Sequence, residues 1–370
     1  MDQLRGLLGE EVVIAALRAM FDNFRGSGTA ALTVPPMDGA FRPNLAIEAA
    51  PVAAACEEPD NVVVAGDAVF FSSKGRLLRL AGDGRAEIVQ EFPEPITAMA
   101  GAADGALALA RESKGVTFIG GARAALKPPA VECGQGGITA MAFIGDDKLA
   151  VAVGSEDNAP DEWRRDLMEL RRSGSVWLCD VASGNAKKMA GGLGYAYGVV
   201  PDDSGCLIVS EAWRAKLTRI DASGGGTTAL DNLPAYPSRI VRDSDGGYWL
   251  ALFAPRNQLV EFVLRERGYR ERMIREIAPE NWVSPTLAPH DSPLNPMQEG
   301  GQKIGGAIKP WAPSFSYGLV ARLDRNLQPE YSLHSRANGR RHGVTSVAER
   351  DKRLFATSKG GGVLVDMSLQ

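Results

Sequence analysis

Residues 199–210 read VVPDDSGCLIVS, and residues 240–251 read IVRDSDGGYWLA. Each stretch is a short apolar run, a turn rich in Asp and Gly, and a second apolar run, which is the pattern of a β-hairpin. Internal repetition with a period of about 20 to 50 residues is typical of propellers, solenoids and other repeat folds. The two near-copies therefore predict an array of similar β-units.

The same pattern recurs elsewhere in the chain. Four more copies are NVVVAGDAVFF at 61–71, ITAMAGAADGALALA at 96–110, ITAMAFIGDDKLAVAV at 138–153 and VTSVAERDKRLFAT at 344–357. Most copies are followed by segments that read as a third and a fourth strand, for example residues 77–80 and 86–90. Six units of about four strands each predict an all-β fold, a six-bladed β-propeller.

The start of the chain does not fit the repeat. We expect residues 1–58 to be an N-terminal helix and an extended connection, and residues 59–370 to form the propeller. Apolar residues at helical spacing predict an amphipathic helix over Asp2–Phe24. Within the connection, we expect Leu45–Ala49 to supply the strand that closes the last blade.

A first insertion, residues 161–172, interrupts the third unit near the expected channel mouth. Trp163, Leu167 and Leu170 fall on one face of a predicted helix, and charged residues fall on the other. A helix in this place either caps the channel mouth or packs on the surface with a solvated charged face.

A second insertion, residues 265–316, is larger. A charged helix is expected over Arg267–Ile277, and the many prolines that follow exclude regular structure. A loop of this length inside a compact fold usually has a function. It is either a lid over the channel or a contact between copies of the chain in a homo-oligomer, carried by Trp282, Met297 and Trp311.

Composition excludes several classes of function. A net charge of −4 offers no basic surface for nucleic acid, and no apolar stretch approaches the roughly 18 to 20 residues of a membrane span. The start of the chain lacks the pattern of a signal peptide. The four cysteines are widely spaced without a CxxC pair, so we expect reduced thiols and a cytoplasmic location.

From residue 174 to 252 the chain resembles the strictosidine synthase-like branch of six-bladed propellers. The motifs that carry this resemblance are GSVWL at 174–178, YGV at 197–199, SEAWR at 210–214, DNLPAYP at 231–237 and RDSDGGYW at 242–249. Weaker similarity extends from Pro59 to the C-terminus. The wider superfamily also contains paraoxonase-like, gluconolactonase-like and regucalcin-like hydrolases.

The resemblance implies a ligand site at one end of the central channel, near the starts of the innermost strands. Those strand ends converge on one axis, so residues far apart in the sequence meet there. In this chain the corresponding positions are Asp60–Asn61, Thr97, Ile138–Thr139, Tyr197, Ser238–Arg239 and His342–Thr345.

Calcium-dependent members of the superfamily hold the ion in a ring of carboxylate and Asn oxygens. Asp60 stands at the place of the first acidic ligand, but Ile138–Thr139, Tyr197 and Ser238–Arg239 replace the others. A guanidinium in such a ring opposes a divalent cation. We therefore expect no cofactor and no metal, with a calcium-dependent lactonase as an alternative.

The condensation catalysed by strictosidine synthases would, by the same resemblance, need a Glu from the last blade. His342 or Thr345 occupies that place, and Glu349 falls well past it. We therefore do not expect this activity. The sequence also has neither a GxSxG elbow nor an HExxH helix.

The remaining groups favour a metal-independent hydrolase of a small-molecule lactone, ester or cyclic amide. We expect His342 as the general base, together with Asp60. Arg239 either holds a substrate oxyanion or pairs with Asp60 across the channel, and His342 is alternatively a turn residue. The expected substrate-binding residues are Arg239, Tyr197, Tyr195, Trp213, Tyr236 and Thr345. Alternatives are a non-catalytic propeller that binds a metabolite or a protein, and a scaffold.

Overall fold

The structure is a computed structural model that describes residues 34–82, 84–289, 303–304, 307–308 and 315–369. The chain divides into two units, Met1–Val34 and Pro35–Gln370, and the second unit contains the strands predicted from the repeat. The helix predicted over Asp2–Phe24 lies outside the described residues.

Six antiparallel sheets form the six blades of a β-propeller in the described part of the chain, as predicted. Blades 1 and 2 consist of β2 (Pro59–Ala65), β3 (Ala68–Ser73), β4 (Arg76–Leu80) and β5 (Ala86–Glu91), then β6 (Ile96–Gly101), β7 (Leu107–Arg111) and β8 (Gly115–Ile119). Blades 3 and 4 consist of β9 (Ile138–Ile144), β10 (Lys148–Val153), β11 (Gly174–Asp180) and β12 (Ala186–Leu193), then β13 (Ala196–Pro201), β14 (Leu207–Glu211), β15 (Lys216–Ile220) and β16 (Gly226–Leu230). Blades 5 and 6 consist of β17 (Ala235–Arg242), β18 (Tyr248–Pro255), β21 (Leu319–Leu323) and β22 (Pro329–His334), then β23 (Val344–Arg350), β24 (Arg353–Ser358), β25 (Val363–Ser368) and β1 (Val52–Ala55).

Blade 2 differs from the four-stranded unit that the sequence predicts. Its sheet has three strands among the described residues, and a short 3-10 helix, Ala122–Ala125, follows β8. Pro128 and Pro129 come next, and neither has an N–H group to donate to a sheet. The chain therefore crosses to blade 3 without forming a fourth strand.

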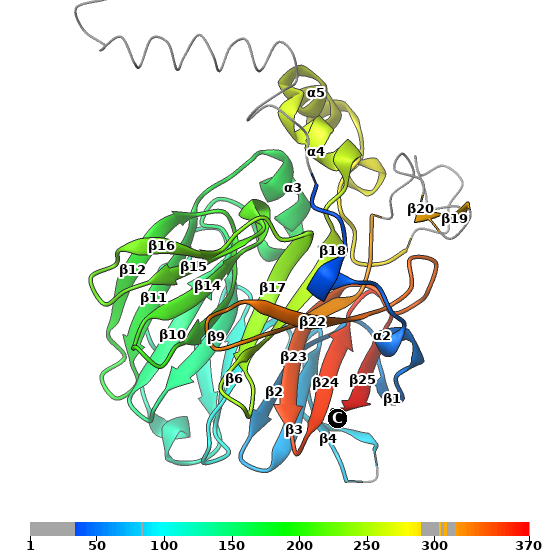
Figure 1. Cartoon of the computed structure of the whole chain (residues 1–370). Helices are drawn as coiled ribbons and strands as arrows, with labels where there is room; N and C mark the ends of the chain where they lie inside the picture. The colour runs from blue at the N-terminus through cyan, green and yellow to red at the C-terminus, as the bar shows by residue number, and fades with distance from the viewer. Residues whose placement is uncertain (1–33, 83, 290–302, 305–306, 309–314, 370) are drawn as a thin grey trace, which may run out of the picture. The chain divides into compact units, whose positions relative to one another are not determined.

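The strand that closes the ring is not the one predicted. Residues 45–49 contain the short helix α2 (Ala46–Ala49), and the side chain of Asn44 accepts a hydrogen bond from the Ala46 N–H at its start. The closing strand is β1, which pairs antiparallel with β25 at the outer edge of blade 6 (Figure 1). The propeller thus begins before residue 59, because its last blade combines β1 with three strands from the C-terminal part of the chain.

The core lies between neighbouring blades. The second strands β7, β10, β14 and β18 are buried along nearly their whole length, because they are covered on both faces. Their sequences are accordingly continuous apolar runs such as YWLALFA at 248–254. The innermost strands β2, β6, β9, β13, β17 and β23 surround the channel, so their first residues meet at one end of it.

The first insertion forms the helix α3 (Trp163–Met168) between β10 and β11. Leu167 is buried and Trp163 is half-buried, as their shared face predicts. Leu170 does not share it, because the helix ends at Met168 and Leu170, with φ of 54°, is 45% exposed.

The second insertion begins earlier than the sequence predicts. The helix α4 (Gln258–Arg265) starts where the Asn257 side chain accepts hydrogen bonds from the N–H groups of the second and third helical residues, and the predicted charged helix follows as α5 (Arg267–Glu276). Trp282 is buried with the apolar faces of α3, α4 and α5. Met297 and Trp311 lie outside the described residues.

The remaining short elements complete the second unit. They are the 3-10 helices Gly39–Phe41, Pro160–Glu162, Ala212–Arg214 and Pro279–Asn281, and the paired strands β19 (Lys303–Ile304) and β20 (Ala307–Ile308). None of the described helices has the length and apolar character of a membrane span.

The closing strand supplies a matched test of the fold. In β1, Ala54 is 8% exposed within the apolar cluster of blades 6 and 1, whereas Ala55 is exposed on the opposite face. Ala54→Asp should lower the free energy of unfolding by about 2 kcal/mol or more, because it buries an unpaired carboxylate. Ala55→Asp should change it by less than about 0.5 kcal/mol. Equal effects in urea unfolding would contradict this register of β1.

Candidate functional site

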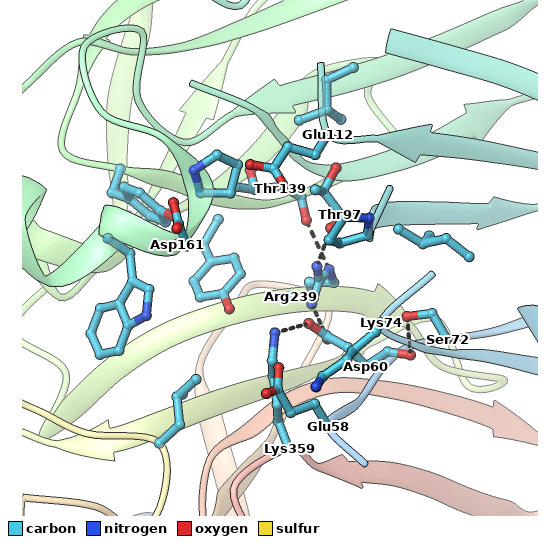
Figure 2. Close-up of a pocket in the computed structure, with 18 residues that line it drawn as sticks. Glu58, Asp60, Ser72, Lys74, Thr97, Glu112, Thr139, Asp161, Arg239 and Lys359 are labelled. Carbon is cyan, nitrogen blue, oxygen red and sulfur yellow. Dashed lines mark hydrogen bonds and ion pairs between the residues drawn. The ribbon is translucent and has the colours of Figure 1, made fainter. Parts of the chain in front are cut away.

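A cavity of about 360 Å³ opens at the end of the channel where the innermost strands begin. Its charged lining residues are Glu58, Asp60, Lys74, Glu112, Asp161, Arg239 and Lys359, most of which Figure 2 shows facing the centre. Its aromatic lining residues are Trp163, Tyr195 and Tyr197. Several blades contribute to this wall, as expected for a site on the axis of a propeller.

Two kinds of position supply the lining. The first is the start of an innermost strand, which places Asp60, Thr97, Thr139, Tyr197 and Arg239 around the axis. The second is the connection between the second and third strands of a blade. It places Lys74, Glu112, Asp161 and Lys359 on the rim. Alignment of the repeats at their strand starts reveals only the first kind of position.

Arg239 joins five other blades at the axis. Its guanidinium forms an ion pair with Asp60 of blade 1, with Nη1 and Oδ1 2.7 Å apart. It also donates hydrogen bonds to the carbonyl oxygens of Thr97 (2.9 Å), Thr139 (2.9 Å) and Thr345 (3.3 Å), in blades 2, 3 and 6. The guanidinium lies 5.3 Å from the ring centre of Tyr197 in blade 4. Of the two alternatives for Arg239, the structure has the pair with Asp60.

Asp60 is held as a carboxylate by this network. Its Oδ1 accepts hydrogen bonds from Arg239, from the Thr345 hydroxyl (2.7 Å) and from the Asn61 N–H (2.8 Å), and its Oδ2 lies 3.2 Å from Lys359 Nζ. Burial by itself raises the pKa of Asp60, but the two cations and these donors lower it to about 2. A carboxylate with such a pKa and with both oxygens occupied is a poor general base.

Lys359 lines the cavity but is absent from the residues that the sequence patterns predict for the site. It follows β24 and lines the cavity, with 27% of its side chain exposed. Burial alone lowers the pKa of Lys359, but the attraction of Asp60, the contributions of Tyr197 and Glu58 and the hydrogen bond to Asp60 together outweigh it, so the net pKa is raised and the ammonium stays charged. Among the described residues, only Asp60 accepts a hydrogen bond from its three N–H donors.

A repeated tripeptide marks this position in the sequence. Ser-Lys-Gly occurs at 73–75, 113–115 and 358–360, each time in the turn between the second and third strands of a blade. Lys74 and Lys114 form ion pairs with Glu57 and Glu94 and are about half exposed. Lys359 is the copy that pairs with an axial carboxylate. Comparing the three copies would have drawn attention to it.

Tyr195 and Tyr197 form the apolar wall of the cavity. Their rings meet edge to face with centres 5.6 Å apart. Tyr195 is 5% exposed, and neither hydroxyl hydrogen-bonds to a described residue. Burial, more than any nearby charge, raises the pKa of both phenols, so they remain protonated donors.

Trp213 and Tyr236 support this wall from behind rather than lining it. The indole of Trp213 packs against Tyr195 with ring centres 4.6 Å apart, and its Nε1 donates to the buried Asp166 of α3 over 2.7 Å. Tyr236 is buried against Trp213 with ring centres 6.2 Å apart. Thr345 is also fully buried, and its hydroxyl donates a hydrogen bond to the carboxylate of Asp60.

His342 does not lie in the cavity, contrary to its predicted place at the mouth. It is fully buried, with Nδ1 2.7 Å from the Ser316 hydroxyl and Nε2 2.8 Å from the carbonyl oxygen of Arg336. These contacts occupy both ring nitrogens and fix the approach to β23. The position of a residue before an innermost strand thus did not reveal where its side chain lies.

Both insertions contribute to the wall. Asp161 and Trp163 of the first insertion line the cavity, so that insertion forms part of the channel mouth as well as packing on the surface. Leu287 of the second insertion also lines it. The lid and the homo-oligomer contact stay predictions.

Sequence comparisons find relatives over part of the chain. An adipocyte plasma membrane-associated protein of Salmo salar is 30% identical over 145 residues, 36% of this chain and 34% of that protein. Its Danio rerio counterpart is 28% identical over 178 residues, 45% of this chain and 40% of that protein. Strictosidine synthase-like 10 of Arabidopsis thaliana is 26% identical over 113 residues, 30% of each chain. The matches thus span less than half of each relative, and no family model matches the chain.

Solved structures share the fold over most of the chain. A putative gluconolactonase superposes with a TM-score of 0.52 at 11% identity, covering 86% of this chain and 91% of its own. The calcium-binding protein regucalcin from Agrobacterium tumefaciens superposes with a TM-score of 0.53 at 12% identity, covering 87% and 94%. At these identities the likeness concerns the fold alone. The resemblance to strictosidine synthase-like propellers is confirmed.

The axial residues do not fit a calcium ion. Calcium needs six to eight oxygen ligands. Here Asp60 supplies the carboxylate at the axis, both of its oxygens are taken by donors, and the two partners Arg239 and Lys359 are cations. No group of three or more His, Cys, Asp or Glu side chains suited to a metal occurs in the described part of the chain.

The ion network predicts a specific acid sensitivity. The pKa of Asp60 is lower in the folded protein than its ordinary value of about 3.9 in an unfolded chain, so the unfolded chain binds more protons as the pH falls. The stability from this group is complete above about pH 5 and is lost toward pH 2, by about 2 to 3 kcal/mol. Asp60→Asn should flatten the pH dependence of urea unfolding by that amount, whereas Asp67→Asn, in an exposed turn, should not. Parallel curves for wild type and Asp60→Asn would contradict the network.

Proposed function

We propose that the chain is a metal-independent hydrolase of a small-molecule lactone, ester or cyclic amide, with its active site in the axial cavity. The observation that carries this proposal is a set of hydrogen-bond donors that face the cavity and still have N–H or O–H groups available to a ligand. Lys359 has N–H groups to spare, and the hydroxyls of Tyr195 and Tyr197 have no acceptor among the described residues. Donors fixed around an apolar pocket are suited to the oxyanion that forms when water attacks a carbonyl group.

Asp60 and Arg239 have a positioning role in this proposal. The carboxylate of Asp60 holds the Lys359 ammonium at 3.2 Å, and Arg239 holds Asp60 at 2.7 Å. Lys359 is therefore fixed before the substrate arrives, so no binding energy is needed to orient it. Asp60 is not the base, because its pKa of about 2 leaves too little affinity for a proton.

The proton from water needs another acceptor. Glu112 and Asp161 line the cavity and form no ion pair with a described residue. In the proposed reaction, the water oxygen bonds to the carbonyl carbon while one of these carboxylates takes the proton. The bond from that carbon to the leaving oxygen or nitrogen then breaks, and the same proton goes to the leaving atom. His342 has no part in this scheme, because it lies outside the cavity.

Support also comes from the shared fold. The structural neighbours include a putative gluconolactonase and an enzyme described as luciferin-regenerating, the latter with a TM-score of 0.50 at 10% identity. In this chain the cations of Arg239 and Lys359 stand at the axis, so the polarising charge that a metal would supply comes from side chains.

The direct test is turnover of a panel of lactones, aryl esters and cyclic amides with and without a chelator. Lys359→Gln should lower kcat/KM about a hundredfold or more, because it removes the main oxyanion donor. Lys114→Gln is the matched control, since it changes an exposed Ser-Lys-Gly lysine away from the cavity and should have no effect. The chelator should not change the rate.

Three outcomes would count against the proposal. If Lys359→Gln leaves the rate of turnover unchanged, Lys359 is not the oxyanion donor. Turnover abolished by the chelator would favour the calcium-dependent alternative. No turnover of any substrate by the wild type would favour a non-catalytic propeller that binds a metabolite.

A further inference from the structure

The two sides of the axial cavity have opposite hydrogen-bonding character. Lys359 of blade 6 offers N–H donors, and the hydroxyls of Tyr195 and Tyr197 of blade 4 add donors on the wall between blades 6 and 3. Tyr195 is only 5% exposed, yet it lines the cavity and has no described acceptor. A ligand group that satisfies these donors must be an acceptor, such as a carbonyl or carboxylate oxygen.

The wall opposite Lys359 carries two carboxylates. Asp161 belongs to blade 3, which lies opposite blade 6 in a ring of six blades, and Glu112 belongs to blade 2 next to it. In Figure 2 these two side chains lie on the far side of the cavity from Lys359. Carboxylates accept hydrogen bonds and donate none, so their complement in a ligand is an N–H group.

The other charges at the mouth do not cancel this polarity. Lys74 pairs with Glu57 at 2.5 Å and is directed to that partner rather than to Glu112 or Asp161. Glu58 is exposed and attracts Lys359 more weakly than Asp60 does. Trp163 lines the cavity beside Asp161, and an indole face next to a carboxylate favours a cationic nitrogen.

We infer that the ligand of the cavity, as substrate or as hydrolysis product, carries a carbonyl or carboxylate group that faces one side and a nitrogen with N–H groups that faces the other. The carbonyl end meets Lys359 and the nitrogen end meets Asp161 and Glu112, with the tyrosine hydroxyls on the wall between them. This inference rests on the proposed function and narrows its substrate class to cyclic amides and amino-substituted esters. A plain lactone lacks the nitrogen, so it leaves both carboxylates without a partner.

The chemistry of cyclic-amide hydrolysis agrees with this polarity. Water adds to the carbonyl carbon, the bond from carbon to nitrogen breaks, and the nitrogen takes up a proton. The product is an amino acid with a carboxylate and an ammonium group at opposite ends. These two charges match the donor side and the acceptor side of the cavity, each with a charge-assisted hydrogen bond.

The experiment compares three probes of one chain length, ε-aminocaproate, caproate and hexylamine, by calorimetric titration of the full chain. We expect ε-aminocaproate to bind about tenfold or more tightly than either singly charged probe. The double variant Glu112→Gln with Asp161→Asn should bind ε-aminocaproate no better than caproate. Lys359→Gln should weaken both acids equally and leave hexylamine unchanged, and Lys114→Gln should alter nothing. Thermal unfolding of each variant checks that it folds.

The outcomes separate this inference from the proposed function. Caproate binding as tightly as ε-aminocaproate, or an advantage that survives the double variant, overturns the inference even when lactones are hydrolysed. No binding of any probe also overturns it. Selective binding of ε-aminocaproate without turnover of any lactone, ester or cyclic amide upholds the recognition and rejects the hydrolase.

Discussion

The rest of the site depends on one ion pair, that between Arg239 and Asp60 on the propeller axis. Both side chains are about nine-tenths buried, and the guanidinium also donates to carbonyl oxygens in three further blades. A buried charge that loses its partner typically costs about 3 to 5 kcal/mol, so neither residue is freely replaceable. The pair thus links the closure of the ring to the arrangement of the cavity above it.

The side-chain cations of Arg239 and Lys359 determine the electrostatic character of the channel axis. Metal-binding propellers need oxygen ligands around the channel, and here Asp60 already serves Arg239 and Lys359. The charge that faces a ligand is then an ammonium group with N–H donors to spare, held in place by the same carboxylate. The shared fold therefore carries different electrostatics at the axis of this chain.

The sequence predicts the fold well because each repeat contains a hairpin, and a hairpin is recognisable from neighbouring residues alone. It predicts the axial ring of Asp60, Tyr197 and Arg239 for the same reason, since the copies align at the strand starts. It fails where a contact is long-range. Residues 45–49 form α2 while β1 closes blade 6, and His342 is turned away from the mouth by Ser316 and the carbonyl of Arg336. Alignment at the strand starts does not reveal Lys359, because it lies in the turn between β24 and β25.

The most direct test of the axial ion pair is a double-mutant cycle of Asp60→Asn and Arg239→Met, read out as the free energy of unfolding at neutral pH. Each single variant leaves a buried polar group without its charged partner, whereas the double variant removes both charges. If the two residues form an ion pair, the losses of unfolding free energy in the two single variants should add up to more than the loss in the double variant. We expect this difference, the coupling energy, to be about 2 to 3 kcal/mol. Single effects that add to within about 0.5 kcal/mol would show that the two residues do not interact, and would contradict the axial ion pair as the basis of the site.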